Sequence, residues 1–327
     1  MIASNPAMPP VKSAASTTRP CNLALVANHG LNQVGDFEKV AHFVRQDSPD
    51  VRPSVWLDQP HRFKRYLLSS RPTFAFSPVP TKEFQLPRGV IAHGRNLAKS
   101  EEYAALDRAG IPIPRYRLLT EENPKPADLP TLGEYVVLKP DRGGRGAMVK
   151  IVKSGRAKWE PAETKIAGQS DALLAQEFIY TGEWPISYRV TTLYGEVLWS
   201  LKQEADHARK PLPGPDGFKQ AGGVTVVSNS KGCTMCLNFD PEIISFAERA
   251  HAAALPDVPL LGIDVIRDAR SGKLYVVELN SIGYVWHFSS PLGLRAQKEF
   301  GFSLEGQFDG LRKAARILAA KARELAR

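Results

Sequence analysis

The residues best suited to chemistry lie in an apolar stretch of the sequence at 261–283. Two runs rich in valine, leucine and isoleucine flank a polar cluster at 268–272, a pattern typical of a β-hairpin. Alternation along the second run places Glu278 and Asn280 on one face, and the hairpin register can turn Asp264 to that same face. Two carboxylates and one amide are the hard oxygen ligands that Mg2+ uses when it bridges nucleotide phosphates. We therefore expect a metal–phosphate site on this hairpin.

An ordinary half-exposed hairpin is the alternative, with Asp264 and Glu278 as solvated polar positions. Their neighbours in sequence argue against it, because both runs are otherwise apolar. Carboxylates among such side chains carry a desolvation cost unless they are paired or bound to a metal. The sequence therefore favours the metal site.

A glycine-rich loop is a second candidate site. An apolar strand ends at Lys139, and Gly143, Gly144 and Gly146 follow before a second strand resumes. Glycines let backbone N–H groups approach phosphate oxygens, and the lysine adds a point charge. A P-loop or a dinucleotide fingerprint would need a helix after the glycines, so neither fits. We expect a phosphate-binding loop, and a flexible hairpin turn is the alternative.

The elements that must position these residues follow an α/β pattern. Strands alternate with short helices from residue 22 onward, which predicts a small parallel sheet. Lys99 lies in the first turn of a further helix, and Gly110 with the prolines after it ends that helix. The elements predicted for the first part are strands at 23–27, 54–57, 73–76 and 90–92 and helices at 36–45 and 61–68.

The order of these features resembles the ATP-grasp superfamily, which includes D-alanine ligases, glutathione synthetases and ribosomal-protein glutamate ligases. The resemblance runs from about residue 96 to residue 283 and implies an α/β fold with the nucleotide between its last two parts. The implied parts are a flexible tail at 1–20, a small N-terminal α/β domain at 21–95, a helix with a strand-rich lid at 96–180, and a mixed α/β core at 181–327.

The resemblance also implies roles for single residues. Asp264, Glu278 and Asn280 would hold Mg2+, with two ions expected and Mn2+ able to replace them. The residues implied to bind ATP are Lys99, Lys139, Gly143, Gly144, Gly146, Glu177, Phe178, Ile179 and Glu183.

Three basic residues are implied to assist catalysis. Arg189 matches an arginine near the acyl phosphate, and Lys202 matches a basic residue near the γ-phosphate. Arg267 matches an arginine near the transferred phosphate, although strict alternation puts it on the opposite face from Asp264. A bulge, a twist or the reach of a long side chain would be needed to bring it to the site.

The implied activity is ATP-dependent ligation of a carboxylate to an amine or another nucleophile through an acyl phosphate, with release of ADP and phosphate. The substrates would be small molecules or peptides. A kinase that stops at phosphoryl transfer and a nucleotide-binding module without turnover are the alternatives. Neither the acid nor the acceptor can be named from the sequence, and a homo-oligomer is expected only because many family members form one.

Composition sets further bounds on the function. The formal net charge of +9 over 327 residues fits an anionic ligand, and the dispersed basic residues favour a nucleotide over nucleic acid. No apolar run is long enough to span a bilayer and the first twenty residues lack an apolar signal segment, so we expect a cytoplasmic protein. Cys233 and Cys236 form an isolated CxxC without a second ligand pair, and we expect ordinary thiols there.

Overall fold

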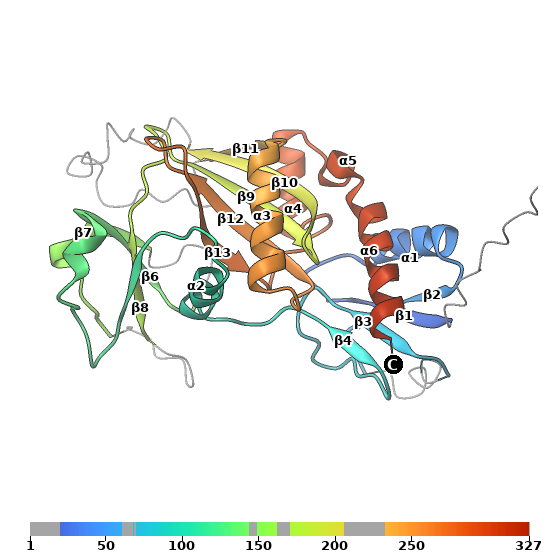
Figure 1. Ribbon diagram of the computed structural model, residues 1–327. Coiled ribbons are helices and arrows are strands. Elements are labelled where there is room, and N and C mark those ends of the chain that lie inside the picture. The colour runs from blue at the N-terminus through green and yellow to red at the C-terminus, as the bar shows by residue number, and fades with distance from the viewer. Residues whose placement is uncertain are drawn as a thin grey trace, which may run out of the picture.

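The computed structural model describes residues 20–60, 68, 70–143, 149–161, 171–205 and 233–326. Within them the chain forms three sheets, arranged in a row from the lid through the core to the N-terminal domain (Figure 1). The tail expected at 1–20 lies outside the described residues except at residue 20, and so does the helix expected at 61–68 except at residue 68.

The N-terminal sheet is parallel throughout, as the alternation of strands and helices predicts, with strand order β2-β1-β3-β4. Every residue of the central strand β1 is buried, because parallel strands are covered on both faces. The stripe Phe37, Val40, Ala41 and Val44 turns one face of α1 toward this sheet. The bounds are β1 Cys21–Ala27, α1 Val34–Asp47, β2 Val51–Leu57, β3 Thr73–Phe76 and β4 Val90–Ala92.

The lid is an antiparallel sheet of order β5-β8-β6-β7 with a small apolar core of its own. In Figure 1 it lies at the end of the molecule opposite the N-terminal sheet. Its elements are β5 Tyr116–Leu119, η2 Leu129–Leu132, β6 Tyr135–Pro140, β7 Lys150–Lys153, η3 Ser154–Arg156 and β8 Leu173–Glu177.

The core sheet is antiparallel, of order β11-β10-β9-β12-β13. Helices α2 and α3 share one apolar cluster with its strands β9, β12 and β13. The Asp240 carboxylate starts α3 by accepting from the backbone N–H of Glu242, at 2.9 Å, just after the helix-starting Pro241. The bounds are α2 Lys99–Arg108, β9 Ile186–Leu193, β10 Glu196–Ala205, β11 Cys233–Leu237, α3 Pro241–Ala254, β12 Leu260–Arg267 and β13 Leu274–Asn280.

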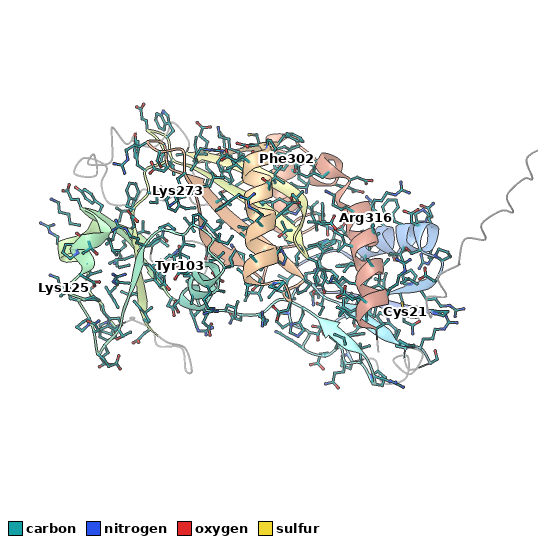
Figure 2. The ribbon with its side chains drawn as sticks, in the orientation of Figure 1. Cys21, Tyr103, Lys125, Lys273, Phe302 and Arg316 are labelled. Carbon is teal, nitrogen blue, oxygen red and sulfur yellow. The ribbon has the colours of Figure 1, made fainter. Side chains whose placement is uncertain are left out.

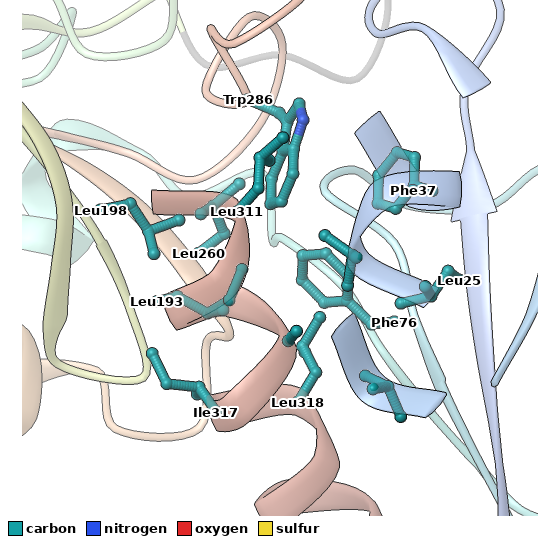
Figure 3. Close-up of a cluster of buried hydrophobic side chains, with 14 of the residues drawn as sticks. Leu25, Phe37, Phe76, Leu193, Leu198, Leu260, Trp286, Leu311, Ile317 and Leu318 are labelled. Atoms are coloured by element: carbon teal, nitrogen blue, oxygen red, sulfur yellow. The ribbon is translucent and has the colours of Figure 1, made fainter. Parts of the chain in front are cut away.

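The C-terminal helix α6 joins the core sheet to the N-terminal domain. Figure 3 shows α6 side chains such as Leu318 between Leu193 and Leu198 of the core and Phe37 and Phe76 of the N-terminal domain, and all of them belong to one apolar cluster. This cluster fixes the two domains against each other across the loop that follows the hairpin. The bounds are α4 Pro291–Phe300, α5 Leu304–Phe308 and α6 Gly310–Leu325.

Within the described ranges, none of the helices has both the length and the apolar character needed to cross a bilayer.

Leu318→Ala tests the joint between domains. Leu318 is fully buried, so we expect the loss of its side chain to lower the free energy of unfolding by about 2–5 kcal/mol in urea denaturation. The matched control is Leu294→Ala on α4, where the leucine is 42% exposed, and its effect should stay within about 0.5 kcal/mol. Equal effects of the two substitutions on the free energy of unfolding would contradict a stabilising role of α6 between the two domains.

Candidate active site

The three predicted metal ligands lie together on one face of the β12–β13 hairpin. Asp264 pairs directly across from Glu278, and the Asn280 side-chain amide lies 3.4 Å from an Asp264 carboxylate oxygen. The register shifts just beyond this pair, so that Val265 faces Val276. Because of this bulge, apolar side chains still fill the α3 face while the polar ones gather on the other.

The bulge also changes the backbone. It leaves Val277 without a direct partner on β12, and the Val277 carbonyl accepts from two side chains of other elements. These are the Lys139 ammonium on lid strand β6, at 2.9 Å, and the Tyr103 hydroxyl on α2, at 2.8 Å. Lid, helix and core therefore meet at one carbonyl, close to where Figure 2 labels Tyr103.

Arg189 on β9 lies beside Asp264 and forms a two-pronged ion pair with it, through Nε and through Nη2 at 2.8 Å. Both side chains are largely buried, which is why each needs the other. Gly262 lies against the guanidinium, where an added Cβ would be in ordinary van der Waals contact, 3.4 Å from the Arg189 Cδ and Nη1 atoms. Burial raises the pKa of the Asp264 carboxyl, and the guanidinium counteracts that rise.

Lys99, in the first turn of α2, reaches both the hairpin and the glycine-rich loop. Its ammonium lies 3.3 Å from the Glu278 carboxylate and donates to the Gly143 carbonyl at 2.8 Å. The helix itself is fixed to the end of β6, because the Asp141 carboxylate accepts from the Ser100 backbone N–H at 2.8 Å. Gly144 and Gly146 lie outside the described residues.

Lys139 is buried at the centre of this cluster. Its ammonium lies 3.2 Å from the Tyr103 hydroxyl and over the Tyr103 ring, 4.9 Å from the ring centre. Burial lowers the pKa of Lys139 to about 8; the charge of Glu278 opposes this, and the charge of Lys99 adds to it. Such a lysine gains its full positive charge when an anion binds beside it.

Two members of the cluster could not be named from the sequence, Glu102 and Tyr103. Glu102 accepts from the Leu279 backbone N–H at 3.2 Å, and burial, then the Glu278 charge, raises its pKa to about 8. The signal was present in the spacing, since residues three and four positions after Lys99 share its helix face. Without the packing of α2 on β13, that face could equally have been solvated.

The predicted adenine hinge follows the end of β8. The Glu177 carboxylate is held by Arg115, with Oε1 2.8 Å from Nη2, and this pairing lowers the pKa of Glu177. Phe178 and Ile179 continue the chain from β8, and Ile179 is buried.

The same segment reaches the hairpin turn. The Tyr180 carbonyl accepts from the Ala269 backbone N–H at 2.8 Å. This hydrogen bond is a second link to the β12–β13 hairpin, in addition to the one between Lys139 and the Val277 carbonyl. Glu183 is exposed, and the structure records no contact between it and the cluster among the residues it describes.

Lys202 lies outside the cluster, and its predicted role near the γ-phosphate stays a prediction. Its cross-strand partner on β9 is Tyr188, one residue away from Arg189, so Lys202 lies on the opposite face of the sheet. Its ammonium pairs with Glu204 at 2.7 Å. A family match at one strand position does not fix the face, and β10 itself carries a bulge between Val197 and Trp199.

Arg267 also lies away from the cluster, and its predicted role beside the phosphates stays a prediction. Its guanidinium lies 3.0 Å from Asp240 and 2.7 Å from Glu242, at the start of α3. Strict alternation from Asp264 gives this opposite face. Arg267 therefore stabilises the helix start.

The CxxC pair does not form a shared site. Cys233 lies opposite Ala205 and Cys236 opposite Lys202, and three positions along a strand separate the two thiols to opposite faces. Neither forms a disulfide among the residues that the structure describes.

The donor set of the hairpin fits Mg2+ by its chemistry. Across the described ranges, no group of three or more His, Cys, Asp and Glu side chains could hold a metal. Asp264 and Glu278 supply two carboxylates, the Asn280 amide supplies a third oxygen, and a nucleotide would complete the set with phosphate oxygens. The positive charges of Lys99 and Arg189 offset the negative charges of Glu278 and Asp264.

Comparison with known proteins identifies the family. The sequence profile of the ATP-grasp domain matches residues 98–281, more than half of the chain and all of the cluster just described. The chain belongs to the ATP-grasp family. A D-alanine–D-alanine ligase of Ectopseudomonas mendocina (strain ymp) is 25% identical over 214 residues. The match covers 64% of this chain and 63% of that one, so this ATP-grasp chain spans less than two thirds of that relative.

Solved structures of similar fold include the ATP-grasp ligase PsnB complexed with a minimal precursor, at a TM-score of 0.52 and 13% identity, covering 91% of this chain and 99% of that one. PsnB complexed with a phosphomimetic precursor variant, Mg and ADP gives a TM-score of 0.51 and 14% identity, with 92% and 99% covered. At such identities the likeness concerns the fold alone, and it confirms the α/β ATP-grasp fold predicted from the sequence.

Glu102→Gln tests the buried carboxyl through pH. Its pKa is raised from 4.5 to about 8, so the folded state holds a proton that the unfolded chain releases. The stability from this group is complete below the unfolded pKa and is lost as the pH rises through about 8. Without metal, the melting temperature of the wild type should therefore fall relative to Glu102→Gln by at least about 4 °C between about pH 5 and pH 8.

The matched control is Glu38→Gln on α1, an exposed position that should keep the wild-type pH profile. Parallel profiles for wild type and Glu102→Gln would contradict a carboxyl with a raised pKa.

Proposed function

We propose that this chain is an ATP-dependent ligase that joins a carboxylate to an amine through an acyl phosphate, releasing ADP and phosphate. One observation carries the proposal: three basic side chains from different elements meet at one hairpin. Lys99 from α2 and Arg189 from the core pair with its carboxylates, and Lys139 from the lid donates to its Val277 carbonyl. Positively charged side chains on three sides of two carboxylates that can bind Mg2+ suit a nucleoside triphosphate. The similarity to a D-alanine–D-alanine ligase supports the same class of reaction.

The reaction divides the work among these residues. Lys99 and Lys139 bind and orient the ATP phosphates, and the buried position of Lys139 makes its interaction with them strong. A carboxylate oxygen of the acid attacks the γ-phosphorus, and the bond to the ADP oxygen breaks. Arg189 stabilises the negative charge on the transferred phosphoryl group. The amine then attacks the acyl carbon, the phosphate leaves, and the amine proton passes to the leaving phosphate or to water.

Mg2+ belongs to this proposal as the partner of ATP. Asp264, Glu278 and Asn280 would hold it, as two ions, with Mn2+ able to replace them. It would supply positive charge that offsets the charge of the phosphate oxygens. The hairpin contributes fixed ligand positions, because both of its strands lie within the core sheet or at its edge.

The adenine is assigned to the segment after β8. Backbone groups at 177–179 lie where the lid chain returns to the core, beside the buried Ile179, and such an apolar strand end suits the adenine edge. Glu183 would reach the ribose from the exposed loop beyond. The lid would move about this hinge, with Gly143, Gly144 and Gly146 as its flap.

Glu278→Gln tests the catalytic role of the hairpin. The substitution keeps the shape of the side chain and removes its charge, so ADP release in the presence of an acid, an amine and Mg2+ should fall at least about 100-fold. Glu38→Gln on the exposed face of α1 should keep the wild-type rate. ADP release that needs the acid but no amine would favour a kinase instead.

Two pairs of variants separate the cluster from the opposite face of the sheet. Lys139→Met and Arg189→Met should lower kcat/KM for ATP by about 100-fold or more, because each removes a charge beside the phosphates. Their matched controls, Lys202→Met and Arg267→Met, should stay within about threefold of wild type, because neither side chain contacts the site. Large losses of kcat/KM in the two controls would instead support the catalytic roles predicted for Lys202 and Arg267 from the sequence.

A further inference from the structure

A cavity lies directly beside Arg189, on the same face of the core sheet as the cluster around Asp264 and Glu278. It has a volume of about 160 Å³ and is bounded by β10, β11, helix α4 and the loop before that helix. Arg189 lines its inner end, so the cavity opens onto the residue that pairs with Asp264. Among the residues the structure describes, it touches the cluster through this guanidinium.

Most of its wall is apolar. Cavities of about 150 Å³ with such walls hold a benzene ring, so this one has room for an aromatic or branched aliphatic side chain. The apolar lining is made by Trp199, Leu201, Met235, Leu292, Ala296 and Phe300.

The inner end carries hydrogen-bond donors that lack acceptors. Trp199 is fully buried, and its indole N–H has no partner among the described residues. Arg189 uses Nε and Nη2 on Asp264, which leaves Nη1 for another anion. A buried donor such as the Trp199 N–H is costly as long as it lacks an acceptor.

His287 adds no charge to this end. Its ring packs against Trp199 with centres 5.4 Å apart, and its Nδ1 lies 2.7 Å from the Ser290 hydroxyl. Burial, helped by the charge of Arg189, lowers the pKa of His287 to about 3. The ring is therefore neutral at physiological pH. The charged side chains that line the cavity are Arg189 at its inner end, Arg295 and Glu299.

We propose that this cavity binds the acid substrate of the ligase, and that this substrate is an amino acid with a branched aliphatic or aromatic side chain. The side chain fills the apolar wall, and the carboxylate lies at Arg189 with the Trp199 indole N–H close by. This proposal rests on the ligase function proposed above and adds the substrate class. Alanine, whose side chain is one methyl group, would leave most of the cavity empty.

Substrate preference gives the first test. One methylene in an apolar pocket changes kcat/KM by about 10–200-fold, so leucine and phenylalanine should exceed alanine and glutamate by at least about 100-fold in ADP release. Both enantiomers of each amino acid are supplied, with a shared pool of amines. Ala296→Trp on α4 should fill the cavity and reduce turnover of leucine at least about 50-fold. Ala253→Trp, exposed on α3, should leave it unchanged.

Binding without turnover separates this proposal from the ligase itself. Leucine, phenylalanine, alanine and glutamate are titrated by calorimetry into the protein holding a non-hydrolysable ATP analogue and Mg2+. We expect leucine or phenylalanine to bind at least about 100-fold more tightly than alanine, and Ala296→Trp to remove that binding while still binding the nucleotide. Equal affinities, no amino-acid binding, or an unaffected Ala296→Trp protein would overturn the cavity proposal. Selective binding without any ADP release would keep it and overturn the ligase.

Discussion

The arrangement depends on two carboxylates that sit among apolar side chains. Asp264 and Glu278 face each other across one hairpin, and each requires a partner to offset its lost hydration. Arg189 and Lys99 provide those partners from a neighbouring strand and from a helix. Because isolated buried charges cost far more than paired ones, the positions of β9 and α2 are constrained by the hairpin. A ligand that carries both anions and cations can replace the partners in these ion pairs without leaving any buried charge unpaired.

This constraint explains why the site lies where three parts of the chain meet. The Val277 carbonyl, freed by the bulge, accepts from Lys139 of the lid and from Tyr103 of α2. The Asp141 carboxylate ties the end of a lid strand to the same helix. Beyond the hairpin, α6 fixes the N-terminal sheet against the core through one apolar cluster. The lid is held to the core both by these polar contacts and by Leu174 and Tyr116, which pack in the apolar cluster of the core.

Much of this could be predicted from the sequence, because the period of apolar residues gives the strands and alternation gives the face of Glu278 and Asn280. The parallel N-terminal sheet followed from the same patterns, and the ATP-grasp fold was implied by the resemblance of the motifs; both are confirmed. The side chains of Lys202 and Arg267 lie away from the cluster, because a match in sequence order carries no information about which face of a sheet a residue takes, and their catalytic roles stay predictions. Glu102 and Tyr103 were missed, because the burial of a helix face depends on packing between distant segments. The unpartnered indole of Trp199 is likewise visible only in three dimensions.

The central claim is that the cluster around Asp264 and Glu278 binds ATP with Mg2+. Calorimetric titration of ATP into the wild-type protein, with Mg2+ and then with EDTA, tests it directly. We predict one nucleotide per chain, bound with Mg2+ and weakened at least about 100-fold in EDTA, because the carboxylates then repel the phosphates. Absence of ATP binding, or binding that is the same with and without Mg2+, would contradict the account.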